Sequence, residues 1–244
     1  MRDVLAIRDL YLNVAGKAVL YGLSLAIPAG EIHVIMGRNG SGKSSLLHAL
    51  VGQIPVASGA VTLDGESLLE LPQEVIARKG LFLAFQMPVA LPGVTVTQLL
   101  RAALQARQEK GKLFNHMQFH DDLEAAMELM GMDPSWANRH VNDGFSGGER
   151  KRCEMLQAIM LKPKYVLLDE IDSGLDVDAT GIMVNAIRLL QRRGTGILIV
   201  THHSRWLEAL NPNGVHLLSD GVILRSGDME LARTIELEGF QAVQ

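Results

Sequence analysis

Eight consecutive residues have the composition and spacing of a phosphate-binding loop. The pattern is two glycines five positions apart, followed by lysine and serine, in the run Gly37-Arg38-Asn39-Gly40-Ser41-Gly42-Lys43-Ser44. Such glycines let backbone N–H groups surround phosphate oxygens, the lysine reaches the β and γ phosphates, and the serine hydroxyl joins the Mg²⁺ shell. We predict that ATP and Mg²⁺ bind here, with Lys43 and Ser45 at the start of the following helix.

Two adjacent acidic residues supply the remaining chemistry. Asp169 directly follows the apolar residues 165–168, so it stands where a buried strand reaches the surface and can hold the hydrated magnesium ion. Glu170 comes next, points elsewhere, and is the candidate base for the attacking water. Two acidic residues at a strand end could be purely structural, but the complete phosphate loop earlier in the chain favours the catalytic interpretation.

Four compact apolar runs predict the strands that bring these residues together. Polar groups follow each run: the glycine-rich loop, Gln86, Asp169-Glu170, and Thr201-His202. The runs themselves are typical of parallel strands buried on both faces, namely Ile32 to Met36, Leu81 to Phe85, Tyr165 to Leu168 and Ile197 to Val200. Because ligands bind beyond the carboxyl ends of parallel strands, the four ends should form a single site.

The rest of the chain divides into two other kinds of structure. Residues 4–27 alternate loosely and are broken at Ala15-Gly16 and Tyr21-Gly22, which predicts short antiparallel strands. Turn residues at Asp64-Gly65 and Asp220-Gly221 predict hairpins. Between Gln86 and Pro163 the apolar spacing is helical, which predicts an inserted helical subdomain. The fold class is therefore α/β.

The pentapeptide Phe145-Ser146-Gly147-Gly148-Glu149 narrows the class. Ser146 and Glu149 have the spacing of a capping box that starts a helix. A helix N-terminus with two glycines also offers N–H groups to an anion. The pentapeptide resembles the signature sequence of the ABC ATPases, and this resemblance extends over the whole chain.

Membership of that family would imply several further roles. The expected fold is the P-loop NTPase fold with a RecA-like core, an N-terminal antiparallel β subdomain and a helical subdomain. A single domain, 1–244, would comprise a core lobe (1–86 and 160–244) and a helical subdomain (87–159). Two subunits would pair head to tail around ATP, so that the signature residues of one cover the nucleotide of the other. The residues implied are Gln86 as a magnesium-binding and catalytic glutamine, Asp176 in the segment Ser173-Gly174-Leu175-Asp176, His202 as the switch histidine, and Ser146, Gly147 and Gly148 on the nucleotide.

Three positions leave alternatives open or depart from the family pattern. His203 is the alternative to His202, although the run Val200-Thr201-His202 favours the first histidine. The signature usually ends in glutamine, so Glu149 would bring negative charge toward phosphate unless it folds back onto the cap. The aromatic residue expected against adenine is replaced by Val14, with Tyr11 out of register, which makes adenine stacking doubtful.

The sequence around these motifs resembles the SufC family more narrowly. The resemblance is carried by Ala84 to Pro88, by Phe145 to Arg152 and by Asp169 to Asp176. It implies an ATPase that drives iron–sulfur cluster assembly with SufB-like and SufD-like partners, which would dock on residues 87–96. One alternative is the ATPase subunit of a membrane transporter. Another is a nucleotide-gated clamp with little turnover, against which Glu170 argues.

Composition excludes some other classes. A net charge of −4 opposes a nucleic-acid-binding role, and runs such as Arg150-Lys151-Arg152 are interpreted as solvated helix faces. The chain has no apolar stretch near the ~20 residues of a membrane span and no signal segment, so we expect a cytoplasmic protein without membrane insertion.

The lone Cys153 cannot hold a cluster by itself. His116 and His120 have helical metal-pair spacing but no third ligand nearby.

Overall fold

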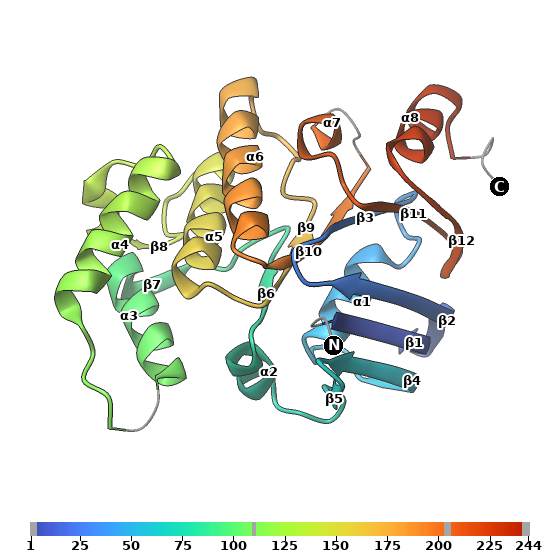
Figure 1. The fold of residues 1–244 in the computed structure, drawn as a ribbon, viewed down its shortest axis with the longest axis horizontal. Helices are drawn as coiled ribbons and strands as arrows, with labels where there is room; N and C mark the ends of the chain where they lie inside the picture. The colour runs from blue at the N-terminus through green and yellow to red at the C-terminus, as the bar shows by residue number, and fades with distance from the viewer. Residues whose placement is uncertain (1–3, 109–110, 203–205, 241–244) are drawn as a thin grey trace.

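A six-stranded sheet forms the centre of the protein (Figure 1). The computed structural model describes residues 4–108, 111–202 and 206–240. The strand order is β12-β11-β3-β10-β9-β6; all neighbours run parallel except β12, which is antiparallel to β11. The bounds are β3 Ile32–Met36, β6 Leu81–Ala84, β9 Tyr165–Asp169, β10 Gly196–Thr201, β11 Gly214–Ser219 and β12 Val222–Gly227. The four apolar runs are thus four adjacent parallel strands, as predicted.

A second, antiparallel sheet holds the N-terminal region. Its order is β2-β1-β4-β5, from strands β1 Val4–Val14, β2 Lys17–Pro28, β4 Val56–Leu63 and β5 Glu66–Ser67. The predicted break at Ala15-Gly16 is the β1–β2 turn, but the predicted break at Tyr21-Gly22 is wrong. Gly22 has φ 72° at an irregularity in the register opposite Tyr11, and β2 continues through it. A glycine absorbs such a bulge without ending the strand.

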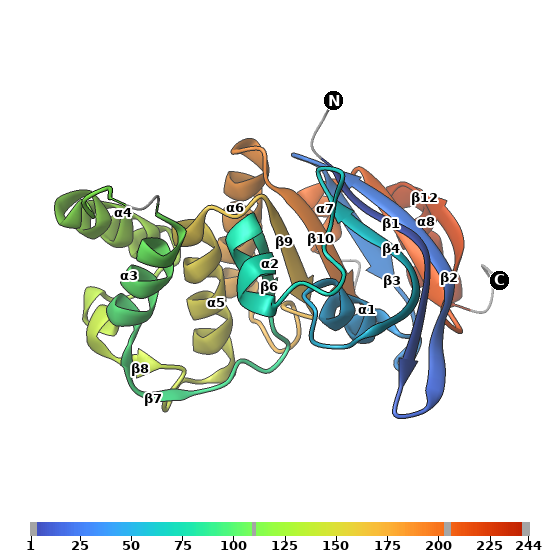
Figure 2. The same cartoon turned by 90° about the horizontal axis from the view of Figure 1, so that it is seen from below.

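The helices form two groups. Five accompany the sheets: α1 Lys43–Leu50, α2 Gln73–Lys79, α6 Val177–Arg192, α7 Leu207–Leu210 and α8 Met229–Glu238. The stretch after Gln86 contains β7 Leu91–Thr95, α3 Val96–Arg107, α4 His116–Leu129, the 3-10 helix η1 Pro134–Asn138, β8 His140–Val141 and α5 Gly147–Leu161. This second group lies at the opposite end of the molecule from the antiparallel sheet (Figure 2). The domain division at 86/87 and 159/160 stays a prediction, and its second boundary falls within α5.

The central sheet separates two apolar cores. Alternate side chains of a strand point to opposite faces, so Ile197 and Ile199 of β10 pack into the helical core while Leu198 and Val200 pack against α1 and the antiparallel sheet. Every residue of β3, β9 and β10 is buried. Burial on both faces explains their continuous apolar sequences and fixes the position of the strand ends. Among the described residues, no helix has both the length and the apolar character needed to cross a membrane.

The packing between β9 and β10 leads to a stability prediction. A Cβ atom on Gly196 would lie 2.3 Å from Cε1 of Tyr165, a side chain that is almost completely buried. Overpacking of this kind costs roughly 1–3 kcal/mol, so Gly196→Ala should lower the free energy of unfolding by that amount in urea titrations.

Gly181→Ala is the matched control for this substitution. Gly181 lies within α6, and a Cβ atom there meets nothing within 4 Å. Because alanine favours a helix over glycine by about 1 kcal/mol, this variant should be as stable as the wild type or more so. Equal stability of Gly196→Ala and the wild type would contradict the predicted clash.

Candidate active site

The predicted phosphate loop connects β3 to α1. Gly40 and Gly42 have φ values of 83° and 102°, which few other residues adopt readily. Gly42 is the N-cap of α1, and no side chain caps the first N–H groups of this helix. Uncapped N–H groups at a helix start bind anions, because they carry hydrogen-bond donors at the positive end of the helix dipole.

Two side chains of the loop match the needs of a bound phosphate. Lys43 is buried, and its Nζ donates to the carbonyl oxygens of Gly37 (2.8 Å) and Arg38 (3.0 Å). Burial lowers the pKa of Lys43, whereas the nearby Glu170 and Asp169 act to raise it. The buried Ser41 hydroxyl has no hydrogen-bond partner among the described residues. A phosphate oxygen would supply the missing partner of Ser41 and an anion for Lys43, so the residues fit the triphosphate of ATP.

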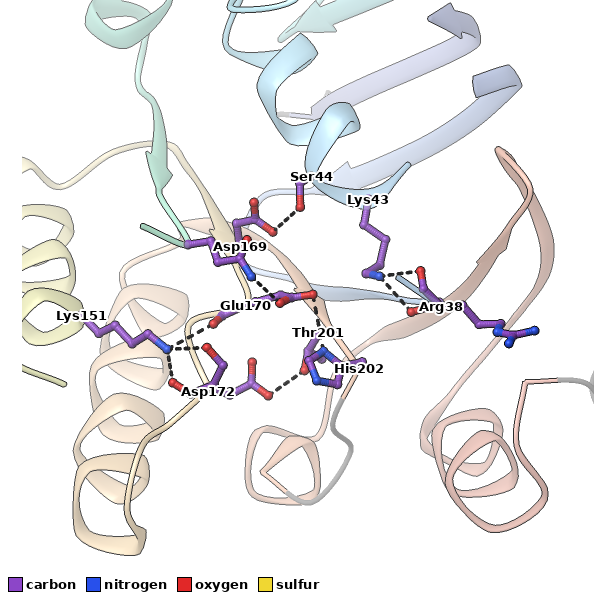
Figure 3. Close-up of polar contacts among 12 residues, drawn as sticks. Arg38, Lys43, Ser44, Lys151, Asp169, Glu170, Asp172, Thr201 and His202 are labelled. Atoms are coloured by element: carbon purple, nitrogen blue, oxygen red, sulfur yellow. Dashed lines mark hydrogen bonds and ion pairs between the residues drawn. The ribbon is translucent and has the colours of Figure 1, made fainter. Parts of the chain in front are cut away.

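Ser44 and Asp169 form the magnesium side of the site. The Ser44 hydroxyl donates to Asp169 Oδ1 at 3.0 Å (Figure 3). Burial raises the pKa of Asp169, and the hydrogen bond from Ser44 acts in the opposite direction. Hydroxyl and carboxylate oxygens are the ligands that Mg²⁺ prefers. The described residues include no group of three or more acidic, histidine or cysteine side chains that could hold a metal ion. Other oxygen ligands, such as the Gln86 amide, phosphate oxygens and water, would therefore complete the shell.

Glu170 turns away from Asp169 and meets two other predicted residues. Its backbone adopts a left-handed conformation (φ 47°), and its N–H donates to the Val200 carbonyl at 3.0 Å. Its carboxylate accepts a 2.7 Å hydrogen bond from Gln86 Nε2 and lies 3.4 Å from His202 Nδ1. Figure 3 shows Glu170 and His202 facing each other from two strand ends. The structure therefore brings together all three residues predicted to be catalytic.

A cavity of about 440 Å³ lies beside the phosphate loop and reaches Gln86 and Glu170, whereas Asp169 and His202 are not among its lining residues. Asn39, Gly40, Gly42, Lys43, Ser44, Ser45, Gln86 and Glu170 line it, together with Val14, Lys17 and Val19 of β1 and β2. No aromatic residue is among its lining residues, and Tyr11 is half exposed elsewhere on β1. The Arg38 side chain points away from Lys43, so this residue contributes its carbonyl oxygen to the loop (Figure 3).

The signature segment has the predicted capping box. Ser146 Oγ accepts from the Glu149 N–H at 3.3 Å, and Glu149 Oε2 accepts from the Ser146 N–H at 2.6 Å. The bond from the Ser146 N–H, helped by the charge of Arg139 at 3.8 Å, lowers the pKa of Glu149. Arg139 in turn lies over the rings of Trp136 and Phe145. The negative charge of Glu149 is thus turned back onto its own helix, as expected.

The signature segment and Asp176 lie apart from the phosphate loop. Ser146 and Gly147 are exposed, and neither they nor Gly148 line the cavity. Both ribbon views show β6 and β9 between α5 and α1 (Figures 1 and 2). Asp176 caps α6 by accepting from the Ala179 N–H at 2.7 Å and also lies outside the cavity lining. One chain therefore brings together only part of the predicted site. His203 lies outside the described residues.

The interpretation of Arg150-Lys151-Arg152 as a solvated helix face is wrong for Lys151. Its ammonium group is buried and donates to Ser173 Oγ at 2.9 Å, to the Ser173 carbonyl and to the Glu170 carbonyl at 3.3 Å. These acceptors satisfy a buried lysine and connect α5 to the segment that follows Glu170. Neither Lys151 nor Arg139 was among the predicted site residues, since their partners are distant in sequence and leave no local pattern.

A buried strand, a glycine loop, an uncapped helix start and a serine–aspartate pair define a P-loop nucleotide-binding protein. Residues 20–173 match the family model described as "ABC transporter". The chain belongs to this family, and it is an ATP-hydrolysing enzyme that uses ATP with Mg²⁺.

Individual relatives cover nearly the whole chain. It is 43% identical to "Vegetative protein 296" of Bacillus subtilis (strain 168), over 99% of this chain and 94% of the relative. The chain is also 42% identical to the "Probable ATP-dependent transporter ycf16" of Pyropia yezoensis, over 98% of this chain and 97% of the relative. Among solved structures, the ADP conformation of an ATP-binding cassette of an ABC transporter has the same fold, with a TM-score of 0.81 and 20% identity. The match covers 100% of this chain and 98% of the cassette. A dimeric bacterial ABC transporter cassette has a TM-score of 0.80 at 19% identity, with coverage of 92% and 98%.

The capping box predicts the behaviour of two substitutions at Glu149. Glu149→Ala removes the bond to the Ser146 N–H and should lower the free energy of unfolding by about 1 kcal/mol. Glu149→Gln can accept the same bond and should lose less. Urea titrations of the two variants and the wild type measure both values. If the alanine variant is as stable as the glutamine variant, the capping box does not stabilise α5.

Proposed function

We propose that this protein is the ATPase subunit of a SufBCD-type cytoplasmic complex that assembles iron–sulfur clusters. The observation that carries the proposal is the signature segment, whose last residue is Glu149 rather than the usual glutamine. The Ser146 N–H and Arg139 hold the Glu149 carboxylate on its own helix. Its negative charge is therefore partly neutralised there, and the start of the helix can still bind an anion. This acidic signature and the basic residues after it are the features shared with the SufC family.

The proposed catalytic step centres on Glu170. Its carboxylate accepts a proton from the attacking water, while Gln86 and His202 hold the carboxylate in place. Lys43 and the loop N–H groups bind the phosphates, and Ser41 donates to a phosphate oxygen. Magnesium, held by Ser44, Asp169 and Gln86, would neutralise phosphate charge. The left-handed backbone of Glu170 supports this assignment, because it directs the carboxylate toward the phosphate loop side of the sheet edge.

A second copy of the chain completes the proposed site. Ser146, Gly147 and Gly148 form an exposed helix start that does not line the cavity of its own chain. In a head-to-tail dimer, this helix start and Asp176 would reach the nucleotide of the partner copy. Two nucleotides would then lie in one symmetric interface. The dimeric state of a solved cassette with the same fold supports this arrangement.

The segment that follows Gln86 is the proposed docking surface for the SufB-like and SufD-like subunits. Its apolar side chains are exposed, with 80% of Met87 and 75% of Val89 accessible, and Leu91 and Val94 partly so. Contiguous exposed apolar groups are typical of protein-binding surfaces. The exposed part of the predicted segment 87–96 ends at residue 94, because Thr95 caps α3 and Val96 is buried at its start. Gln86 contacts Glu170, so a partner bound at residues 87–94 lies next to a residue that touches the catalytic carboxylate.

The second candidate is the ATPase subunit of a membrane transporter. The names of several relatives favour it, among them the probable ABC transporter ATP-binding proteins of Streptococcus pyogenes. The same surface at residues 87–94 would then bind a membrane-embedded partner. A clamp with little turnover is the third candidate, and the contacts that hold Glu170 argue against it.

The catalytic proposal predicts the effect of Glu170→Gln. This variant keeps the side-chain shape but removes the base, so ATP turnover should fall by about 10²–10⁴-fold. ATP should then accumulate in the closed dimer, which size-exclusion chromatography with ATP and Mg²⁺ detects. Glu128→Gln, at an exposed position on α4, is the control and should turn over ATP at the wild-type rate. Wild-type turnover by Glu170→Gln would refute the assignment of the base.

Affinity purification from the native cell distinguishes the candidate functions. We expect two soluble partners in stoichiometric amount without detergent, with iron–sulfur clusters forming on them. The experiment is run with and without detergent, and the partners are identified by mass spectrometry. Recovery of only a polytopic membrane protein, and only with detergent, would replace the cluster-assembly function with the transporter function.

A further inference from the structure

A groove beside the proposed docking surface contains a buried carboxyl group. The groove has a volume of about 510 Å³ and lies between the end of β6, the segment after Gln86, and α5. Its walls include the apolar side chains of Phe82, Phe85, Val89 and Leu91. Among the described residues that line this groove, Glu154 is the only ionisable one. We call it the Glu154 groove.

Glu154 has few groups to stabilise its charge. Only 6% of the residue is exposed. Its carboxylate accepts a long bond from the Phe85 N–H (3.4 Å) and one from Gln157 Nε2 (3.2 Å), and no cationic group among the described residues pairs with it. Burial raises its pKa to about 7, against the opposing hydrogen bonds of Phe85, Gln157 and Asn142. A buried carboxylate without a cation is costly, so its presence in a binding groove requires an explanation.

Asn142 supplies a second acceptor in the same groove. Its Nδ2 donates to the Val89 carbonyl at 3.0 Å, within the exposed docking segment. Its Oδ1 is buried and has no donor among the described residues. The Glu154 groove therefore has apolar walls and two acceptors: the Glu154 carboxylate, which has hydrogen-bond donors but no cationic partner among the described residues, and Asn142 Oδ1, which has no donor among them.

We propose that the Glu154 groove binds an arginine side chain of the partner subunit. A guanidinium group has several donors in one plane, enough for Glu154 and Asn142 together, and it is weakly hydrated and stacks on aromatic rings such as Phe85. A lysine ammonium is more strongly hydrated and loses more on entering apolar walls. This inference rests on the proposed docking function of residues 87–94 and specifies the chemistry that the partner must present there.

The position of the groove connects this contact to the catalytic site. The Phe85 N–H donates to Glu154, and the next residue, Gln86, donates to Glu170. An arginine that binds Glu154 competes with the long Phe85 bond and so acts on the backbone directly before Gln86. Recognition of the partner and positioning of the catalytic carboxylate therefore involve adjacent residues.

A small probe tests the groove without the partner. In NMR titrations at pH 8, n-butylguanidinium should shift the amide signals of Phe85, Val89 and Leu91 and bind at least tenfold more tightly than its neutral analogue n-butylurea. Glu154→Gln should abolish this difference, whereas Glu128→Gln should retain it. Equal binding of the two probes by the wild type, or a preference retained by Glu154→Gln, would overturn the inference.

The same titration has a defined pH dependence. The groups that face Glu154 are the Phe85 N–H, Asn142, Gln157 and Cys153, and burial raises the pKa of Cys153 to about 12, so the thiol stays neutral. Guanidinium binding requires the ionised form of Glu154, which prevails above pH 7 and is lost as the pH falls through 7. Affinity should fall by up to about tenfold per pH unit below that value. A flat profile from pH 8 to pH 6 would contradict the proposed ion pair.

Calorimetry with the purified SufB–SufD-type partner tests the inference in the complex. Glu154→Gln should weaken binding at least tenfold, and Glu154→Asp should lose less because it keeps the charge. Thermal unfolding checks the free variants, and Glu154→Gln should be no less stable than the wild type at pH 8. Val89→Glu tests the docking surface separately. If only Val89→Glu weakens binding, the arginine inference fails and the docking surface stands; if neither does, both fail.

Discussion

Asp169 and Glu170 leave the end of β9 in different directions, and the two halves of the nucleotide site depend on this divergence. Asp169 is the last residue of the strand and accepts a hydrogen bond from the Ser44 hydroxyl. The left-handed backbone of Glu170 instead places its carboxylate between Gln86 and His202. A non-glycine residue in this conformation costs of order 1 kcal/mol and persists only when its surroundings determine it. Here the bond from the Glu170 N–H to Val200, on the neighbouring strand, holds the turn.

The central sheet provides the rigidity that this arrangement requires. Residues from β3, β6, β9 and β10 reach the site at one edge, and each strand is fixed by cores on both faces. The signature segment is organised differently. Its structure depends on local contacts among Ser146, Glu149 and Arg139, so the start of α5 forms without any contact to the phosphate loop. A rigid site in one chain and an independently formed helix start are suited to reversible closure between two copies.

Local sequence patterns predicted the central strands and the phosphate loop because each rests on nearby residues. Compact apolar runs followed by polar groups are strands whose ends meet, and the capping box is a contact across three residues. The break expected at Tyr21-Gly22 failed because a long antiparallel partner retains a glycine bulge within the strand. Lys151 and Glu154 escaped prediction for another reason. Their burial depends on carbonyl, amide and apolar groups far along the chain, which no short window of sequence contains.

The wall formed by Val14 and Val19 has a consequence for the choice of nucleotide. Against a base, these apolar side chains would offer dispersion contacts that any purine or pyrimidine shares, and no hydrogen-bonding group that distinguishes adenine from guanine. Most of the binding free energy then comes from the triphosphate, which all nucleoside triphosphates share. We therefore expect this wall to distinguish poorly between bases, so that the triphosphate and its magnesium ion, rather than the base, decide what the pocket binds.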